Sequence, residues 1–457
     1  MKNARLDATQ GSLVRSIFAY AFPLLLTTLM QKLFSAVDIA ILGNMADTTA
    51  VASVGATTMI IDLLVSSFIG FSSGTKIILA RQVGAKDKDS LQKTISMSIL
   101  FSLSVGLAIA VIGFFLAPTL LRVTHCPSAC FESAKSYLRL YVLSSPAILL
   151  YNFVSSAIAA TGDSKRPLYY MIASGLLNVV LNLALCFVLS DKVVAVALAT
   201  VLSQLLGAFL VMRHILKTKD LCGFAMSNLH WNQKAFGDII RYGGPLMLLA
   251  LLEPFANLQM QTEVNLLDNN VAAVAGNSAG VTMETLLHGI STSFAATTTA
   301  FMGQNIGAGN KERAKKTFFY CLSFAFLFST VLSGMMFLSK DFWLSMILTD
   351  DLASYQFAHV RMQVVVLAYF LSAVNNCVAH GTQALGYPVI TMFTGAICSS
   401  GFRMLWIAFV YPYFAPSYFA LVICTTLSWL LLLVSNTVVF FFLFRRYLKK
   451  DALQAVG

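Results

Sequence analysis

Residues 14–43, VRSIFAYAFPLLLTTLMQKLFSAVDIAILG, decide the fold of this chain. The stretch is long and apolar enough to cross a bilayer as a helix, yet it contains Pro23, Lys32 and Asp38. A charged side chain at the centre of a membrane helix costs about 2.5 to 3.5 kcal/mol, so we expect these charges to face a protein-lined cavity. Proline removes one backbone hydrogen bond, and neighbouring helices can compensate for that loss in a membrane. The stretch therefore predicts a mobile, ion-sensing spanning helix.

Composition assigns the whole chain to the polytopic membrane proteins. Of its 457 residues, 58% are hydrophobic and only 11% are charged, which does not describe a surface exposed to water. Twelve apolar segments lack the alternation of barrel strands and are long enough for spanning helices. They cover residues 14–42, 51–80, 94–121, 137–160, 167–189, 193–215, 241–266, 271–303, 317–338, 358–384, 388–411 and 417–444.

The basic residues predict the orientation of the chain. Most of the 31 lysines and arginines lie on one side if the N-terminus is cytoplasmic, and Arg361 is among the few assigned to the opposite side. The positive-inside rule then places both termini in the cytoplasm of a cell-membrane protein. The first segment has no small-residue cleavage site, so we expect it to serve as an uncleaved signal. The net charge of +11 is explained by this topology and by anionic lipid headgroups, and the dispersed basic residues give no support for nucleic-acid binding.

Three landmarks recur about 222 to 224 residues later in the chain. They are Pro23 and Pro245, Gly84 and Gly307, and Gly162 and Gly386. A tandem repeat of six helices explains the common offset, and because six is even the two copies are parallel. We therefore predict an all-α membrane protein of twelve transmembrane helices in two parallel six-helix repeats. The predicted lobes are residues 1–216 and 241–444, joined by a cytoplasmic linker, 217–240, and followed by a cytoplasmic tail, 445–457.

Two carboxylates are the strongest candidates for coupling to an ion. Asp38 lies toward the outer end of the first segment, where a solvated interfacial aspartate is the structural alternative. Glu253 lies near the middle of its segment and precedes Pro254, and its alternative role is a structural hydrogen bond. A carboxyl group that binds H⁺ or Na⁺ differently in two conformations lets a gradient bias those conformations.

A second set of polar residues is predicted to line a substrate or ion cavity. Glu284 and His288 share one helix face and form either a proton relay or a structural clasp. Arg403 is interpreted as a counter-ion whose partner the sequence does not identify. The set comprises Gln31, Asn178, Asn182, Thr200, Glu284, His288 and Arg403.

The cysteines show one cluster, His125, Cys126 and Cys130, in a predicted outer loop. A disulfide or a metal site is open there, but the spacing fits no standard zinc pattern. We expect no metal and no cofactor other than the coupling ion.

Several motifs together resemble the MATE (multidrug and toxic compound extrusion) transporters over essentially the whole chain. They are the proline and aspartate of the first segment, SSGTKIILARQVGAKD at 72–87, ATGDSKRP at 160–167 and ATTTAFMGQNIGAGNKERA at 296–314. The resemblance implies H⁺- or Na⁺-driven antiport of organic, often cationic, compounds by alternating access between two lobes.

The resemblance also implies roles for individual residues. Asp38 matches the first-helix aspartate of the family, and Glu253 matches the seventh-helix glutamate of branches that couple through the C-terminal lobe. Asn178 and Thr200 match polar residues of the DinF-like branch. That branch can carry an aspartate where this chain has Asn182. In the tenth predicted helix, where other branches carry another acid, the chain has asparagines at 375 and 376.

Two other classes of function are alternatives to a drug transporter. A flippase for lipid-linked oligosaccharides of the same superfamily would need a wider cationic cavity than Lys32 and Arg403 provide. An enzyme would need a catalytic cluster, and the sequence has no HExxH motif. We expect a monomeric transporter whose partners are small organic substrates and membrane lipids.

Overall fold

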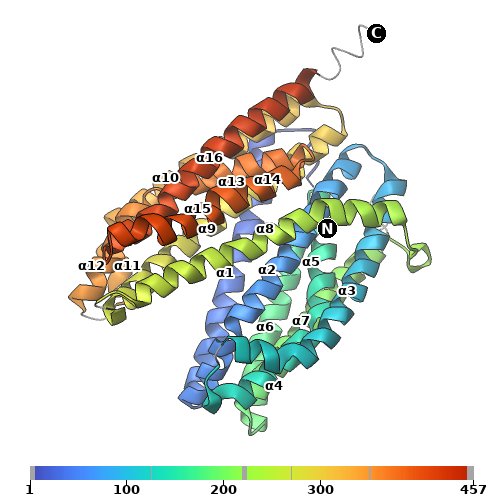
Figure 1. The fold of residues 1–457 in the computed structure, drawn as a ribbon. Coiled ribbons are helices and arrows are strands. Elements are labelled where there is room, and N and C mark those ends of the chain that lie inside the picture. Colours follow the sequence, from blue (N-terminus) through green and yellow to red (C-terminus); the bar gives the residue numbers. More distant parts are fainter. Residues whose placement is uncertain (1–5, 125, 219–223, 269, 349–350, 450–457) are drawn as a thin grey trace. The chain divides into compact units, whose positions relative to one another are not determined.

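The computed structural model describes residues 6–124, 126–218, 224–268, 270–348 and 351–449, and every regular element among them is a helix (Figure 1). The predicted all-α fold is confirmed. The first half of the chain forms α1 (Leu13–Met45), α2 (Thr48–Gly84), α3 (Lys88–Val123), α4 (Phe131–Leu143), α5 (Ser145–Ala160), α6 (Lys165–Val188) and α7 (Lys192–Lys217). The second half forms α8 (Gln233–Asn265), α9 (Asn270–Gly307), α10 (Lys311–Leu338), α11 (Lys340–Ser345), α12 (Leu352–Arg361), α13 (Tyr369–Ala384), α14 (Pro388–Gly395), α15 (Phe402–Leu405) and α16 (Tyr418–Lys449).

Each predicted apolar segment lies on one helix or on consecutive helices. Within the described ranges, ten helical stretches are long and apolar enough to cross a membrane, and a bent pair makes an eleventh. That pair, Ser128–Leu143 and Ser145–Ala160, bends by 43° just before Pro146 in the first turn of the second helix, because proline cannot continue the first helix. Helix α9 covers the segment 271–303 and has 38 residues, but its many hydroxyl and amide side chains make it less apolar. The chain is a multi-pass membrane protein.

Three π-helical turns interrupt the helices of the second half. They are Met362–Val366 between α12 and α13, and Ala396–Gly401 and Trp406–Val410 on either side of α15. A π-helical turn widens the helix locally, and such turns are frequent at functional sites. Arg361 immediately precedes the first turn, and Arg403 lies between the other two.

The turns at the predicted repeat landmarks have matching backbone conformations. Lys86 and Gly309, which follow the Gly-Ala pairs, both have positive φ, at 54° and 71°. Gly162 and Gly386 have φ of 88° and 93°. The residue after each of the first two turns caps the next helix: Asp87 accepts a hydrogen bond from the Ser90 amide at 3.0 Å, and Asn310 caps α10 in the same way. The bonds from Ser90 lower the pKa of the exposed Asp87 carboxyl.

The chain divides into two compact units that exchange helix segments. Unit 1 contains Leu26–Met247 with the residues up to Asp7, and unit 2 contains Ala8–Leu25 and Leu248–Gly457. The division therefore passes through α1 and α8, in each case two residues after a proline, Pro23 or Pro245. The predicted lobes follow the sequence repeat, and their boundaries stay a prediction. The compact units divide the chain at other points, because each unit includes the leading part of the other repeat's first helix.

Close backbone contact holds the leading part of α8 in unit 1. A Cβ added to Gly74 of α2 would lie 2.4 Å from Cα of Gly243, and one added to Gly70 would lie 2.6 Å from the carbonyl oxygen of Leu246. Only glycine allows the two helices to approach this closely. In the predicted linker, residues 219–223 lie outside the described residues, and Phe236 already belongs to α8, where its ring packs on Trp231.

Unit 2 is built around α9, which packs against α10, α12 and α13. The stacked rings of Phe318 and Phe440, 4.1 Å apart, join α10 to α16 in its core. The leading part of α1 belongs to this unit, and Phe18 contacts Phe294, Phe324 and Phe328 there.

Candidate functional site

Unit 1 brings Asp38 of α1 together with two asparagines of α6. The amide nitrogen Nδ2 of Asn182 donates to Oδ1 of Asp38 at 2.5 Å and to Oδ1 of Asn178 at 3.2 Å. The asparagines are four residues apart, so they share one helix face, and both are buried. Asp38 is half-buried and forms no ion pair within 4.0 Å among the described residues.

The amide of Asn182 uses only one of its two ends. Its Oδ1 is buried and has no hydrogen-bond partner in the described part of the chain. An unsatisfied buried acceptor is costly, and it marks a place where a proton donor or a hard cation would gain a ligand.

The other predicted residues of unit 1 lie less close to the acid. Thr200 of α7 donates to the carbonyl of Val196 at 3.0 Å in its own helix and faces Tyr137 of α4. Gln31 is exposed, seven residues before Asp38 on α1, and its side chain makes no hydrogen bond within the described ranges. That Thr200 and Gln31 line a substrate or ion cavity stays a prediction.

Two buried tyrosines near the acids were missed by sequence reasoning. Tyr137 lies within electrostatic range of Asp38, and Tyr141, one turn later on α4, lies within range of Asp62. Their spacing of four places both phenols on one face of α4. The signal in the sequence is this spacing of two tyrosines at the start of the predicted segment 137–160.

Glu284 of α9 has a counter-ion that the sequence did not identify. Nε of Arg361 lies 2.5 Å from Oε1 of Glu284, and Arg361 is 3% exposed. From the sequence, Arg361 was counted only among the basic residues of the non-cytoplasmic side, and the structure shows that it is buried at the end of α12. His288 shares a helix with Glu284 but lies 3.4 Å from the hydroxyl of Tyr369 through its Nδ1.

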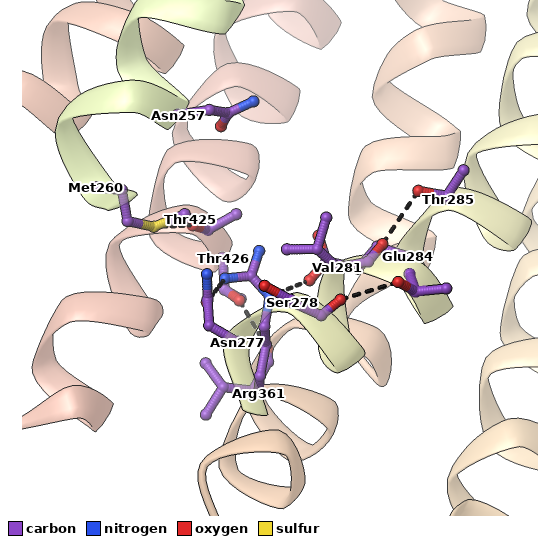
Figure 2. A network of polar contacts seen from close by, with 12 residues as sticks. Asn257, Met260, Asn277, Ser278, Val281, Glu284, Thr285, Arg361, Thr425 and Thr426 are labelled. Carbon is purple, nitrogen blue, oxygen red and sulfur yellow. Dashed lines mark hydrogen bonds and ion pairs between the residues drawn. The ribbon is translucent and has the colours of Figure 1, made fainter. Parts of the chain in front are cut away.

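A network of amides extends from this ion pair. Oδ1 of Asn277 accepts hydrogen bonds from Arg361 Nη1 at 2.6 Å and from the hydroxyl of Tyr418 at 3.0 Å. The other end of that amide donates to Gln261 of α8 at 3.0 Å, and Gln261 donates to Asn265 at the same distance. Figure 2 shows Arg361 lying between Asn277 and the turn of α9 that carries Glu284.

Arg403 and Glu253 are two further charged groups of unit 2. Arg403 is 4% exposed, and its Nε donates to Ser428 Oγ at 3.0 Å and its Nη1 to Asn257 Oδ1 at 3.2 Å. It has no carboxylate within 4.0 Å in the described residues, and Glu253 is the acid with the largest electrostatic effect on it. Glu253 is exposed on α8, one turn before Asn257.

In the tenth predicted helix, asparagines occupy the positions where other branches of the family carry an acid, and each asparagine is hydrogen-bonded to a neutral side chain. Asn376 donates to Ser291 Oγ at 2.8 Å, and Asn436 donates to Oδ1 of Asn375 at the same distance. No carboxylate of α13 is therefore available to unit 2 at these positions.

The described cysteines of the cluster form no disulfide in this structure. Cys126 and Cys130 are both free thiols, and burial together with the nearby Cys130 raises the pKa of the Cys126 thiol. His125 lies outside the described residues. Among the described residues, no three His, Cys, Asp or Glu side chains are grouped as a metal site would require.

Known proteins resemble this chain over most of its length. The family model MatE matches residues 23–184 and 245–408. The probable multidrug resistance protein YpnP of Bacillus subtilis (strain 168) is 26% identical over 312 residues, which are 67% of this chain and 68% of that protein. The probable multidrug resistance protein YoeA of the same strain is 25% identical over 385 residues, or 83% and 82% of the two chains.

The fold is shared with solved transporters. A multidrug resistance MATE family transporter of the MOP superfamily, solved in an outward-facing conformation, has a TM-score of 0.86 to this chain. The alignment covers 98% of both chains at 18% identity, which supports a common fold.

Proposed function

Because this chain belongs to the MatE family of multidrug transporters, we propose that it exports organic, often cationic, compounds in exchange for H⁺ or Na⁺. Relatives named as multidrug resistance proteins support the export of drugs. Alternating access between two lobes would carry the exchange.

The contact between Asp38 and Asn182 carries the proposal. A carboxylate withdrawn from water needs a counter-charge or a proton, and Asp38 has only a neutral amide donor, at 2.5 Å. Glu284 is different, because Arg361 neutralises it permanently. Asp38 therefore has to take its counter-charge from solution, as a coupling residue must.

The oxygen atoms of Asp38 and Asn182 could bind either H⁺ or Na⁺. A proton on Asp38 would remove the charge outright. A sodium ion would need several oxygen ligands, and rotation of the Asn182 amide would turn its unpartnered Oδ1 toward Asp38. One monovalent cation moving down a 100 mV potential releases about 2.3 kcal/mol, enough for a roughly 50-fold gradient of a neutral drug.

Glu253 is the second acid of the proposal. It is exposed on α8, so a coupling ion and the ammonium of a substrate can compete for it. Competition of this kind would link drug release to ion entry.

The test is efflux of ethidium from proteoliposomes under a proton gradient and, separately, a sodium gradient. We expect Asp38→Asn to abolish gradient-driven efflux, and Glu253→Gln to weaken it. The matched control is Asp89→Asn, an exposed acid of α3 that pairs with Lys93 and should leave efflux unchanged. Full activity of Asp38→Asn would refute the coupling role. Failure of both gradients to move any cationic dye would refute drug antiport and favour the flippase hypothesis.

We further propose that the transporter acts as a monomer in the cell membrane with both termini in the cytoplasm. The positive-inside distribution supports this orientation, and exposed basic residues such as Lys315 and Lys316 at the start of α10 lie on the predicted inner side. Labelling of single cysteines placed at residues 315 and 342 from either side of intact cells would test the orientation.

A further inference from the structure

Two opposite charges in unit 2 lack an ionic partner. Glu284 and Arg361 neutralise each other, whereas neither Glu253 nor Arg403 has an opposite charge within 4.0 Å among the described residues. Glu253 nevertheless exerts the largest electrostatic effect of any carboxylate on Arg403. Arg403 binds Asn257, which lies one turn after Glu253 on α8, so the two charges are neighbours that form no ion pair.

The guanidinium of Arg403 is held in place by neutral groups only. Ser428 Oγ and Asn257 Oδ1 accept one hydrogen bond each, at 3.0 and 3.2 Å. A guanidinium has five N–H donors, so three of them have no protein acceptor in the described part of the chain. Burial of a charge without a counter-ion is expensive, which is why such a group attracts an anion.

The position of Arg403 gives a ligand a route to it. Asn257, which binds its Nη1, is exposed on α8, and the exposed Glu253 lies one turn earlier on the same helix. The π-helical turns on both sides of α15 widen the helix that carries Arg403. Its guanidinium thus lies beneath an exposed polar face of α8.

The other charged groups near Arg403 do not fill this role. Glu284 acts on it more weakly than Glu253 and is already bound by Arg361, and Cys424 is a buried thiol. An anion beside Arg403 and a cation beside Glu253 would supply the two missing counter-charges.

We propose that Arg403 and Glu253 form a two-point site for zwitterionic organic substrates, in which Arg403 binds a carboxylate and Glu253 binds an ammonium or other organic cation. The site rests on the transport function proposed above and defines a substrate class for it. A guanidinium binds a carboxylate through paired N–H donors, with a geometry that the two neutral acceptors cannot supply. A simple organic cation would satisfy Glu253 but leave Arg403 unpaired.

A matched pair of dyes tests the site. Tetramethylrhodamine carries a cationic ring system and a free carboxylate, and its methyl ester keeps the cation but lacks the negative charge. For the full chain in lipid nanodiscs, we expect fluorescence anisotropy to give a Kd for the ester about tenfold above that for the zwitterion, as one charge-assisted hydrogen-bonded contact predicts.

Variants then assign the preference to Arg403. Arg403→Gln should bring the ratio of the two Kd values to about one, and Arg403→Lys should retain part of it. The control is Arg139→Gln: this arginine of α4 in unit 1 bonds the carbonyl of Phe114 at 3.2 Å and should leave the ratio unchanged. Glu253→Gln should weaken both dyes together, since both carry the cation.

The outcomes separate this site from the transport proposal. A wild-type ratio near one overturns the site without any variant, so the test survives if a variant fails to fold. A ratio that Arg403→Gln leaves unchanged also overturns it. Gradient-driven efflux of the ester without a binding preference would leave transport standing and remove the site. A preference that depends on Arg403, with no efflux under either gradient, would support the site and refute the antiport.

Discussion

Nε of Arg361, the last residue of α12, lies 2.5 Å from Oε1 of Glu284 on α9, and both side chains are largely withdrawn from solvent. Arg361 also donates to Asn277, which lies about two turns before Glu284 on α9. The pair therefore fixes α12 to α9 at the point where the π-helical turn Met362–Val366 begins.

Breaking this ion pair should destabilise unit 2. Glu284→Gln leaves the Arg361 guanidinium buried without a counter-ion, and the loss of one partner of a buried pair costs about 3 to 5 kcal/mol. We expect a clearly lower Tm of the purified protein in detergent. Asp89→Asn breaks the exposed pair with Lys93, 2.5 Å apart, and should cost less than about 1 kcal/mol. Equal Tm values for the two variants would contradict the structural role of the Arg361 pair.

The helices could be predicted from sequence because apolar length and repeat landmarks are local signals. Each landmark glycine marked a turn, and the positive φ at Gly162 and Gly386 gives the physical reason. The polar residues of the site could be listed for the same reason, since a charge or amide inside an apolar segment is conspicuous.

The partners of those residues could not be predicted. Asp38 and Asn182 are 144 positions apart, and nothing in either segment specifies which helices become neighbours. Arg361 was counted only for the orientation of the chain because it lies near the start of its apolar segment, and the π-helical turn that follows it has no sequence signature. The exchange of α1 and α8 between the units was equally hidden, because both parts of each helix are apolar.

Glycine contacts between α2 and α8 give a second prediction. Gly74→Ala would place a methyl group 2.4 Å from Cα of Gly243, so the helices must separate, and overpacking of this kind costs about 1 to 3 kcal/mol. Gly237, also in α8, is the matched control, since a Cβ there would meet nothing within 4 Å. Gly237→Ala should be neutral or stabilise by up to about 1 kcal/mol through helix propensity. Thermal unfolding of both variants decides the point, and a Gly74→Ala protein as stable as wild type would show that α2 and α8 do not pack as described.

The segment before α1 should depend on Arg313 for its order. The guanidinium of Arg313 donates to the carbonyls of Ala8 at 2.7 Å, Gln10 at 2.5 Å and Gly11 at 2.8 Å, and Gln304 accepts the amide of Ala8. Arg313→Ala removes three charge-assisted bonds, so amide hydrogen exchange at Ala8 should accelerate by about tenfold or more.

The control for that experiment lies two residues further along α10. Lys315 is exposed, and Lys315→Ala removes a charge of the same sign without touching the segment before α1. Hydrogen exchange measured by mass spectrometry on the peptide that contains Ala8 should not change in this variant. Acceleration in both variants would attribute the effect to net charge rather than to the bonds of Arg313.

The prolines of α1 and α8 should act as hinges, because each lies two residues before its helix passes from one compact unit to the other. Proline lacks the N–H that would bond the carbonyl four residues earlier, which makes bending at that point less costly. Pro23→Ala and Pro245→Ala restore the bond and stiffen the helices, so the rate of dye efflux from proteoliposomes should fall several-fold while the Kd for the dye stays close to wild type. Pro118→Ala is the control, since this proline lies inside α3 and within unit 1 alone. If all three variants slow efflux equally, or if the Kd rises in proportion to the loss of rate, the prolines serve packing or binding and the hinge interpretation fails.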